Sequence, residues 1–99
     1  MTKYVSNVRF KVKKDHHEEM LKLHEDFNLI DYKGALSFQL IDCGEGKYFS
    51  TIIWENENSL VESRPALIAF LDKFRSILEE ISPELGLTDP ASGKIIFET

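Results

Sequence analysis

Histidines near the first expected helix are the side chains of this sequence best suited to proton transfer. His17, Met20 and His24 recur at helical spacing, so they lie near one face of a helix. A neutral imidazole on a half-buried face accepts a proton near neutral pH, which predicts His24 as a catalytic base with His17 contacting the ligand. The alternative is a half-buried His24 that fills space and reaches a backbone carbonyl, with His17 in solvent.

Metal binding by these histidines is not expected. His17 and His24 stand seven positions apart, which separates their backbones by about 10.5 Å along a helix. No HExxH motif accompanies them, and Cys43 is the one cysteine of the chain. We therefore expect a site that works without a metal or another cofactor.

Aromatic and polar side chains in the middle of the chain offer the remaining chemistry. Tyr48 and Trp54 can stack on an aromatic ligand, and the hydroxyl of Tyr48 or Thr51 can donate a hydrogen bond to a phenolate oxygen. Arg64 can hold an anionic group or remain in water. Packing within a subunit interface is the alternative role of both Tyr48 and Trp54.

Composition excludes several classes of partner. The chain has 12 Lys and Arg against 17 Asp and Glu, a formal net charge of −5, which repels the phosphates of nucleic acid. Its longest apolar run, residues 66–71, is far shorter than the roughly 20 residues of a membrane-spanning helix, and residues 1–4 contain no apolar signal region. We expect a cytoplasmic protein that binds neither nucleic acid nor membranes, and a lone cysteine fits a reducing compartment.

The elements that must position these residues follow the order β-α-β-β-α-β. Apolar residues alternate in the strands and recur every three or four positions in the helices, and Asp15 and Glu18 have the spacing of a capping box. With right-handed crossovers, this order predicts a ferredoxin-like α+β fold, one four-stranded antiparallel sheet with both helices on one face, as a single domain over residues 1–99. The expected strands are 3–12, 35–41, 48–54 and 94–98, and the expected helices are 16–27 and 65–81, the second preceded by a helical turn at 60–62.

The middle hairpin predicts a second subunit. A glycine-rich turn that is symmetric places Leu40 opposite Phe49, and Tyr48, Ile52 and Trp54 then share the sheet face away from the helices. A sheet face in water alternates cleanly with polar residues, so large apolar groups on that face need a cover. We therefore expect a homodimer through the open sheet face.

Four stretches of the sequence carry a family resemblance. They are residues 8–13 ahead of an acidic helix, residues 54–60 at a strand end, Ser63 with residues 65–70, and residues 87–96. Together they resemble the antibiotic biosynthesis monooxygenase family of small dimeric α+β barrel proteins. The resemblance implies a homodimer whose sheets pack face to face, with a small cavity between sheet and helices in each subunit. It further implies oxidation of aromatic, polyketide-like molecules without metal or flavin in some members, and haem degradation in others.

Haem degradation is not expected for this chain. Haem-degrading members use an Asn on the first strand with a Trp and a His on the second helix. Asn7 resembles the first of these by its place on the strand, which implies a ligand-binding role for Asn7. Ser63 and Lys73 stand where the Trp and the His would fall.

Two functions remain open. The first is metal-free oxygenation or isomerisation of a small aromatic or enolisable ligand; the second is a non-catalytic dimeric ligand-binding or accessory module. A connected cavity touched by His24 and a second polar group favours the enzyme, and a cavity filled by phenylalanines favours the module. The expected catalytic residues are His24, Thr51 and Tyr48, and the expected ligand contacts are Asn7, His17, Trp54 and Arg64.

Overall fold

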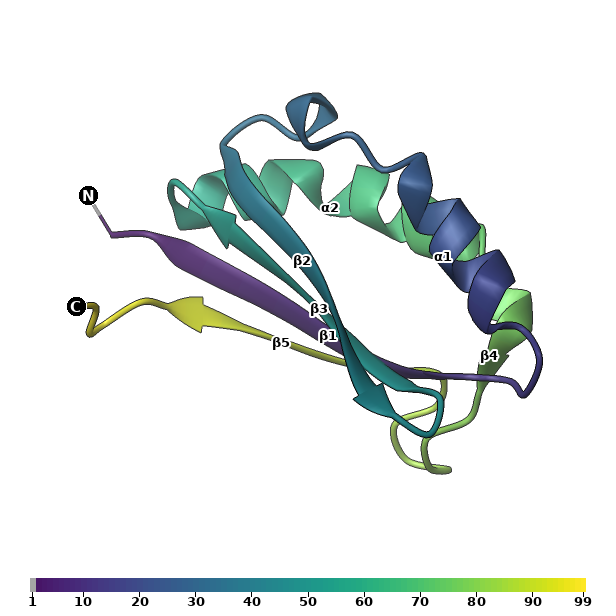
Figure 1. Cartoon of the computed structure of the whole chain (residues 1–99). Coiled ribbons are helices and arrows are strands. Elements are labelled where there is room, and N and C mark those ends of the chain that lie inside the picture. Colours follow the sequence, from purple (N-terminus) through teal and green to yellow (C-terminus); the bar gives the residue numbers. More distant parts are fainter. Residues whose placement is uncertain (1) are drawn as a thin grey trace.

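The computed structural model describes residues 2–99 and shows one sheet covered on one side by two α-helices (Figure 1). Two short 3-10 helices, Leu29–Asp31 and Arg75–Ile77, lie in the connections. The strands are β1 (Tyr4–Val12), β2 (Ala35–Gly44), β3 (Lys47–Trp54), β4 (Leu78–Glu79) and β5 (Thr88–Lys94), and the helices are α1 (His17–Glu25) and α2 (Glu57–Asp72).

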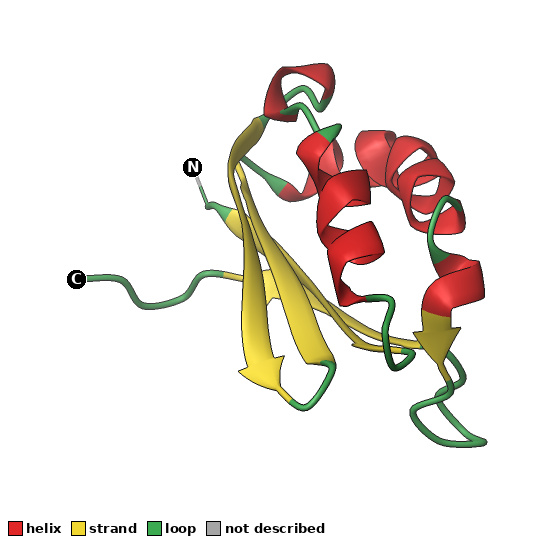
Figure 2. Cartoon of the chain, turned by 45° about the vertical axis from the view of Figure 1, so that its right-hand side comes forward, coloured by secondary structure: helices red, strands yellow, loops and turns green. Residues whose placement is uncertain are grey.

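All strand pairs are antiparallel, and β1 is central. β3 flanks β1 on one side, with β2 beyond it, while β5 and the short β4 share the other side of β1. Both helices cover the same face of this sheet (Figure 2). The ferredoxin-like α+β fold is thus confirmed, with five strands among the described residues where four are expected. The last strand lies at Thr88–Lys94 in place of 94–98 because residues expected in a turn, including Pro90, pair with β1 on an edge strand, where proline is tolerated.

The second helix lies at Glu57–Asp72 in place of 65–81, and the break expected at residues 63–65 is absent. α2 runs without interruption through Pro65 and ends at Asp72, and the Asn56 side chain accepts a hydrogen bond from the backbone N–H of Ser59 at its start. Leu78, expected on this helix, instead pairs with Val12 in β4 and is only 2% exposed. Sheet pairing therefore takes residues that helical periodicity alone assigns to α2.

The first helix begins without the expected capping box. Asp15 has a φ of +70°, in the left-handed region, and belongs to the turn before the helix. His16 occupies the N-cap position with no side-chain hydrogen bond to the first turn, and α1 spans His17–Glu25 in place of 16–27. The prediction of an Asp15 cap is wrong because the left-handed turn moves that side chain out of the cap position.

The hairpin between β2 and β3 has a register one residue away from the expected one. Its tip is a two-residue turn at Glu45 and Gly46, both with positive φ as a type I′ turn requires. A bulge at Cys43 adds one residue to β2, so Ile41, and not Leu40, lies opposite Phe49. A shift of one residue moves every side chain of a paired strand to the other face.

The register change reverses the two faces of β3. Tyr48, Ile52 and Trp54 are 4%, 5% and 0% exposed and pack beneath the helices, so their expected place on the outer face is wrong. The open face carries a different apolar set, all of intermediate exposure: Val5, Ile41, Phe49 and Ile53.

The core lies entirely between the sheet and the helices, in two clusters. One gathers around Phe10, Met20 and Phe74, and the other around Ile52, Trp54 and Leu60. Among residues 2–99, no helix has the length and apolar character to cross a membrane.

Candidate functional site

A cavity of about 520 Å³ lies between the helix-facing side of the sheet and α2. This volume is within the range of pockets that bind small molecules. Its wall is largely apolar and aromatic, contributed by the two helices and by β1, β2, β3 and β5. The polar side chains along it include those of Ser6, His24, Ser50, Arg64 and Ser92.

One face of α2 forms the roof of this cavity. Leu60, Arg64, Leu67 and Leu71 recur every three or four residues and all line the space. The Asn56 cap fixes where this helix starts, and Leu60, only 3% exposed, anchors its first turns against the core. The same packing that stabilises α2 therefore aligns Arg64 with the cavity.

His24 lies on α1 inside a cage of phenylalanine rings. The ring centroids of Phe70 and Phe74 lie 5.2 and 5.0 Å from the centroid of the imidazole, and the Phe70 ring meets it edge-on. The rings of Phe10 and Phe38 stack at 6.3 and 6.2 Å. These contacts remove water from most of the imidazole and fix its orientation toward the cavity wall.

The hydrogen bond and the burial of His24 decide which ring nitrogen carries the proton and keep the ring neutral. Nδ1 lies 2.9 Å from the carbonyl oxygen of Met20, an acceptor, so Nδ1 carries the proton and donates. Nε2 is then an acceptor in the neutral ring. Burial lowers the pKa of His24 below its ordinary 6.5, an effect larger than the opposing one of the Met20 hydrogen bond. His24 is thus a neutral base at neutral pH, as general-base catalysis requires.

Three serines supply hydroxyl groups on the cavity floor. Ser6 on β1 lies directly opposite Ser92 on β5, and Ser50 on β3 lies opposite Val8. The Ser6 oxygen accepts a hydrogen bond from Trp54 Nε1 at 3.0 Å, which leaves the Ser6 hydroxyl hydrogen to donate elsewhere. The sequence-based reasoning missed all three. Ser6 and Ser50 carry a usable signal, since each interrupts an alternating apolar pattern.

Two of the expected site residues pair with each other on the opposite side of the sheet. Asn7 and Thr51 are register partners, and the Asn7 amide donates to Thr51 Oγ1 at 2.9 Å. Their positions alternate with those of Ser6 and Ser50, which face the helices. Thr51 is therefore not brought together with His24, while Arg64 is, and Asn7 also borders the cavity although its side chain bonds Thr51. Trp54 does not line the cavity: its ring is fully buried in the core on the same side of the sheet, and it reaches the site only through its hydrogen bond to Ser6.

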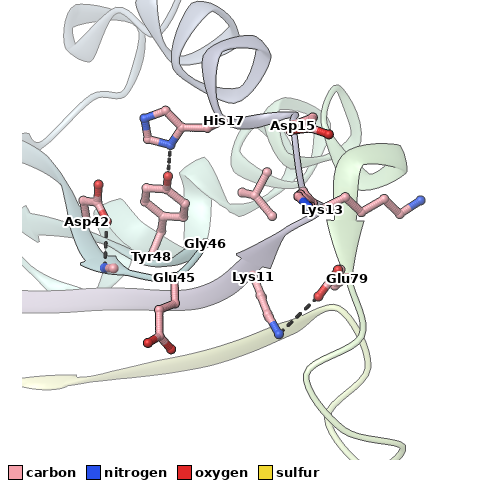
Figure 3. Close-up of a pocket in the computed structure, with 12 residues that line it drawn as sticks. Lys11, Lys13, Asp15, His17, Asp42, Glu45, Gly46, Tyr48 and Glu79 are labelled. Carbon is pink, nitrogen blue, oxygen red and sulfur yellow. Dashed lines mark hydrogen bonds and ion pairs between the residues drawn. The ribbon is translucent and has the colours of Figure 1, made fainter.

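The other two expected residues, Tyr48 and His17, meet in a second hollow of about 450 Å³ (Figure 3). The Tyr48 hydroxyl and His17 Nδ1 form a hydrogen bond there. Lysines and carboxylates dominate the rest of the rim, including a Lys11–Glu79 ion pair at 3.2 Å. Nowhere within residues 2–99 do three His, Cys, Asp or Glu side chains gather as a metal site would need. The Tyr48 ring, which lines this hollow, stacks on Phe10, which lines the cavity of His24.

Comparison of the chain with known proteins identifies its class of fold. No protein-family model matches the sequence, and no curated protein matches it either. Solved structures do match over nearly the whole chain, and they include candidate antibiotic biosynthesis monooxygenases. The chain thus has the fold of antibiotic biosynthesis monooxygenase-like proteins, as the sequence resemblance predicts.

Three of these structures illustrate the similarity. The NE2512 protein of unknown function from Nitrosomonas europaea superimposes with a TM-score of 0.75 at 14% identity, over 100% of this chain and 94% of that one. A candidate antibiotic biosynthesis monooxygenase from Deinococcus radiodurans gives 0.75 at 12% identity, covering 97% and 95%. A variant of SnoaB, a cofactor-independent oxygenase from Streptomyces nogalater, gives 0.68 at 9% identity, covering 97% and 95%.

Proposed function

We propose that this protein is an enzyme that binds a small aromatic or enolisable molecule in the 520 Å³ cavity and removes a proton from it with His24. One observation carries the proposal: the neutral imidazole of His24 lines an apolar cavity of ligand size. Its hydrogen bond to Met20 uses Nδ1, so Nε2 is left as a proton acceptor. A surrounding of phenylalanine rings favours a planar ligand, since aromatic pairs prefer offset-stacked or edge-to-face contact. The similarity of fold to a cofactor-independent oxygenase supports the same class of reaction.

The reaction that fits these residues needs no external reductant. Nε2 of His24 takes a proton from the acidic C–H or O–H of the ligand, and the apolar wall protects the resulting carbanion or phenolate from water. The electron-rich anion reduces O₂, one oxygen atom entering the ligand and the other leaving as water. Oxidation of a CH₂ group to a ketone balances in this way, because the ligand supplies all four electrons. Without O₂, return of the proton to another carbon completes an isomerisation.

Ligand binding and oxygen consumption test the proposal together. We expect hydroxylated aromatics or 1,3-diketones to raise the thermal unfolding temperature of the wild-type chain, and at least one of them to consume O₂. His24→Gln should lose turnover by about 10²-fold or more, as expected for a general base. His16→Gln, at a histidine outside the cavity, is the matched control and should keep wild-type turnover.

The outcomes separate the enzyme from the non-catalytic module. Binding without O₂ consumption or isomerisation, equal in wild type and His24→Gln, would establish the ligand-binding module instead. Absence of binding across the whole panel would refute the proposed enzyme and favour an accessory module.

We also propose that two copies of the chain associate through the open face of the sheet. Val5 pairs with Ile53 there and Ile41 with Phe49, and together they form an apolar strip that the polar pair of Asn7 and Thr51 interrupts in the middle. An identical strip on a second copy is self-complementary about a two-fold axis, as a closed dimer requires. Stacked sheets about 10 Å apart would bury these side chains on both sides.

Sedimentation velocity tests the dimer. The wild-type chain should sediment as a dimer, and Phe49→Lys should sediment as a monomer because it places a charge in the apolar strip. Ile30→Lys changes an apolar residue that is 83% exposed elsewhere, in a connection, and should remain dimeric. A monomeric wild-type chain would refute the proposal.

A further inference from the structure

The geometry of α2 points to a charged ligand: we propose that the molecule bound in the cavity carries an ionised carboxylate, and that Arg64 determines this specificity. The inference rests on the proposed function and narrows its substrate class to aromatic carboxylates. Its starting point is that an arginine, Arg64, is among the residues that line a cavity that is otherwise largely apolar.

Arg64 is held by its helix at the mouth of the cavity. It follows Leu60 by one turn and precedes Leu67 by one turn, and both leucines line the same space. Arg64 itself is exposed, so its charge remains hydrated while one side of the group meets the cavity. An ordinary solvent-facing arginine would lie on the opposite stripe of α2.

No carboxylate within residues 2–99 lies close enough to Arg64 to form an ion pair, although the chain as a whole is acidic. The second arginine of the cavity contrasts with it. Arg75 Nε donates to Asp72 Oδ1 at 2.6 Å, so the charge of Arg75 is already balanced. Arg64 is thus the cavity cation left available for a ligand, and a guanidinium binds a carboxylate through two parallel hydrogen bonds.

The spacing of residues along α2 indicates the length of the ligand that we expect. Phe70, whose ring contacts His24, follows Arg64 by six residues, a rise of roughly 9 Å at 1.5 Å per residue. We therefore expect a rigid ligand about two fused rings long, with its carboxylate near Arg64 and its acidic group near His24. The serine hydroxyls of the floor lie below it, on the sheet.

The test compares two probes that differ only in charge: 6-hydroxy-2-naphthoate and its neutral primary amide. In titration calorimetry, the affinity of the wild-type chain for the carboxylate should exceed its affinity for the amide by about fivefold or more, as expected for a partly screened ion pair. Added salt should reduce this preference. Arg64→Gln should abolish the preference while amide binding stays unchanged.

Two further variants complete the design. Lys22→Gln removes one positive charge from an exposed site on α1 outside the cavity, and should keep the full preference for the carboxylate. Arg75→Gln should keep it as well, because Asp72 already balances that arginine.

Each remaining outcome is decisive. Equal affinity of wild type for the two probes, or a preference that survives Arg64→Gln or vanishes in Arg75→Gln, overturns the inference and leaves the proposed function standing. A wild-type chain that binds neither probe, nor any compound of the aromatic panel, overturns the proposed function and the inference with it.

Discussion

The hydrogen bond between Trp54 and Ser6 links the core to the cavity floor, and its removal gives a sharp test of the structure. Trp54 is 0% exposed and its Nε1 donates to Ser6 Oγ at 3.0 Å. Ser6→Ala leaves the buried indole N–H without an acceptor, which costs about 1–3 kcal/mol of unfolding free energy. For a chain of 99 residues, each kcal/mol lowers the thermal midpoint by roughly 4–8 °C. We expect a loss of about 2 kcal/mol, near 10 °C.

A double-mutant cycle shows whether this energy belongs to the hydrogen bond. Trp54→Phe removes the donor, so adding Ser6→Ala to it should cost less than about 0.5 kcal/mol, and the two changes should couple by about 1.5 kcal/mol. Ser92→Ala, the register partner of Ser6 across β1 and β5, is the control and should stay within about 0.5 kcal/mol of wild type. Urea denaturation measures the free energy of unfolding of wild type, of the three variants of the cycle and of Ser92→Ala. Additive single changes would refute the assigned hydrogen bond.

Three further predictions concern the backbone, the titrating base and the core. Gly34→Ala should destabilise far more than Gly86→Ala. Both glycines have positive φ, but an added Cβ at position 34 would lie 2.1 Å from the Ser59 oxygen, whereas nothing lies within 4 Å at position 86; equal urea midpoints would contradict this. Because the pKa of His24 is lowered from 6.5, the unfolded chain takes up a proton before the folded chain does as the pH falls. The stability contributed by His24 should thus be complete above pH 6.5 and decline below it, and urea titrations of His24→Gln should lack that slope. Phe74→Ala, at a site 3% exposed beside His24, should cost about 3–5 kcal/mol and widen the cavity, and calorimetry showing a loss below about 1 kcal/mol would count against the packing described.

The candidate site was only partly predictable from its residues. His24 could be chosen in advance because helical spacing places it on the apolar face of α1, and the cavity beside it agrees with that choice. Thr51 could not be placed correctly, because its position depends on the register of β3 against β1 and β2. Trp54 was expected on the outer face for the same reason, and instead lies fully buried on the helix-facing side, where it donates a hydrogen bond to Ser6.

The missed cavity residues come from distant parts of the chain. Ser6, Ser50 and Ser92 meet only because β3, β1 and β5 lie side by side, and no local pattern brings these three positions together. Ser92 was further hidden in a segment with the composition of a turn. Arg75 was missed because its place in the 3-10 helix after α2, and its pairing with Asp72, depend on where α2 stops.

Short-range patterns by themselves determined the order of strands and helices, the hairpin turn, and hence a ferredoxin-like fold with both helices on one face. These features follow from periodicity and glycine positions, which act over a few residues, and from the handedness of strand–helix–strand crossovers, a general rule that needs no specific contact. Tertiary structure alone decided which face of β3 is buried, where α2 ends, and which polar groups share the cavity with His24. The bulge at Cys43 sets the register that buries one face of β3 in place of the other. The pairing of Leu78 with Val12 places Leu78 in a strand, beyond the end of α2. Such contacts join residues far apart in the chain, so their energies are absent from any local segment.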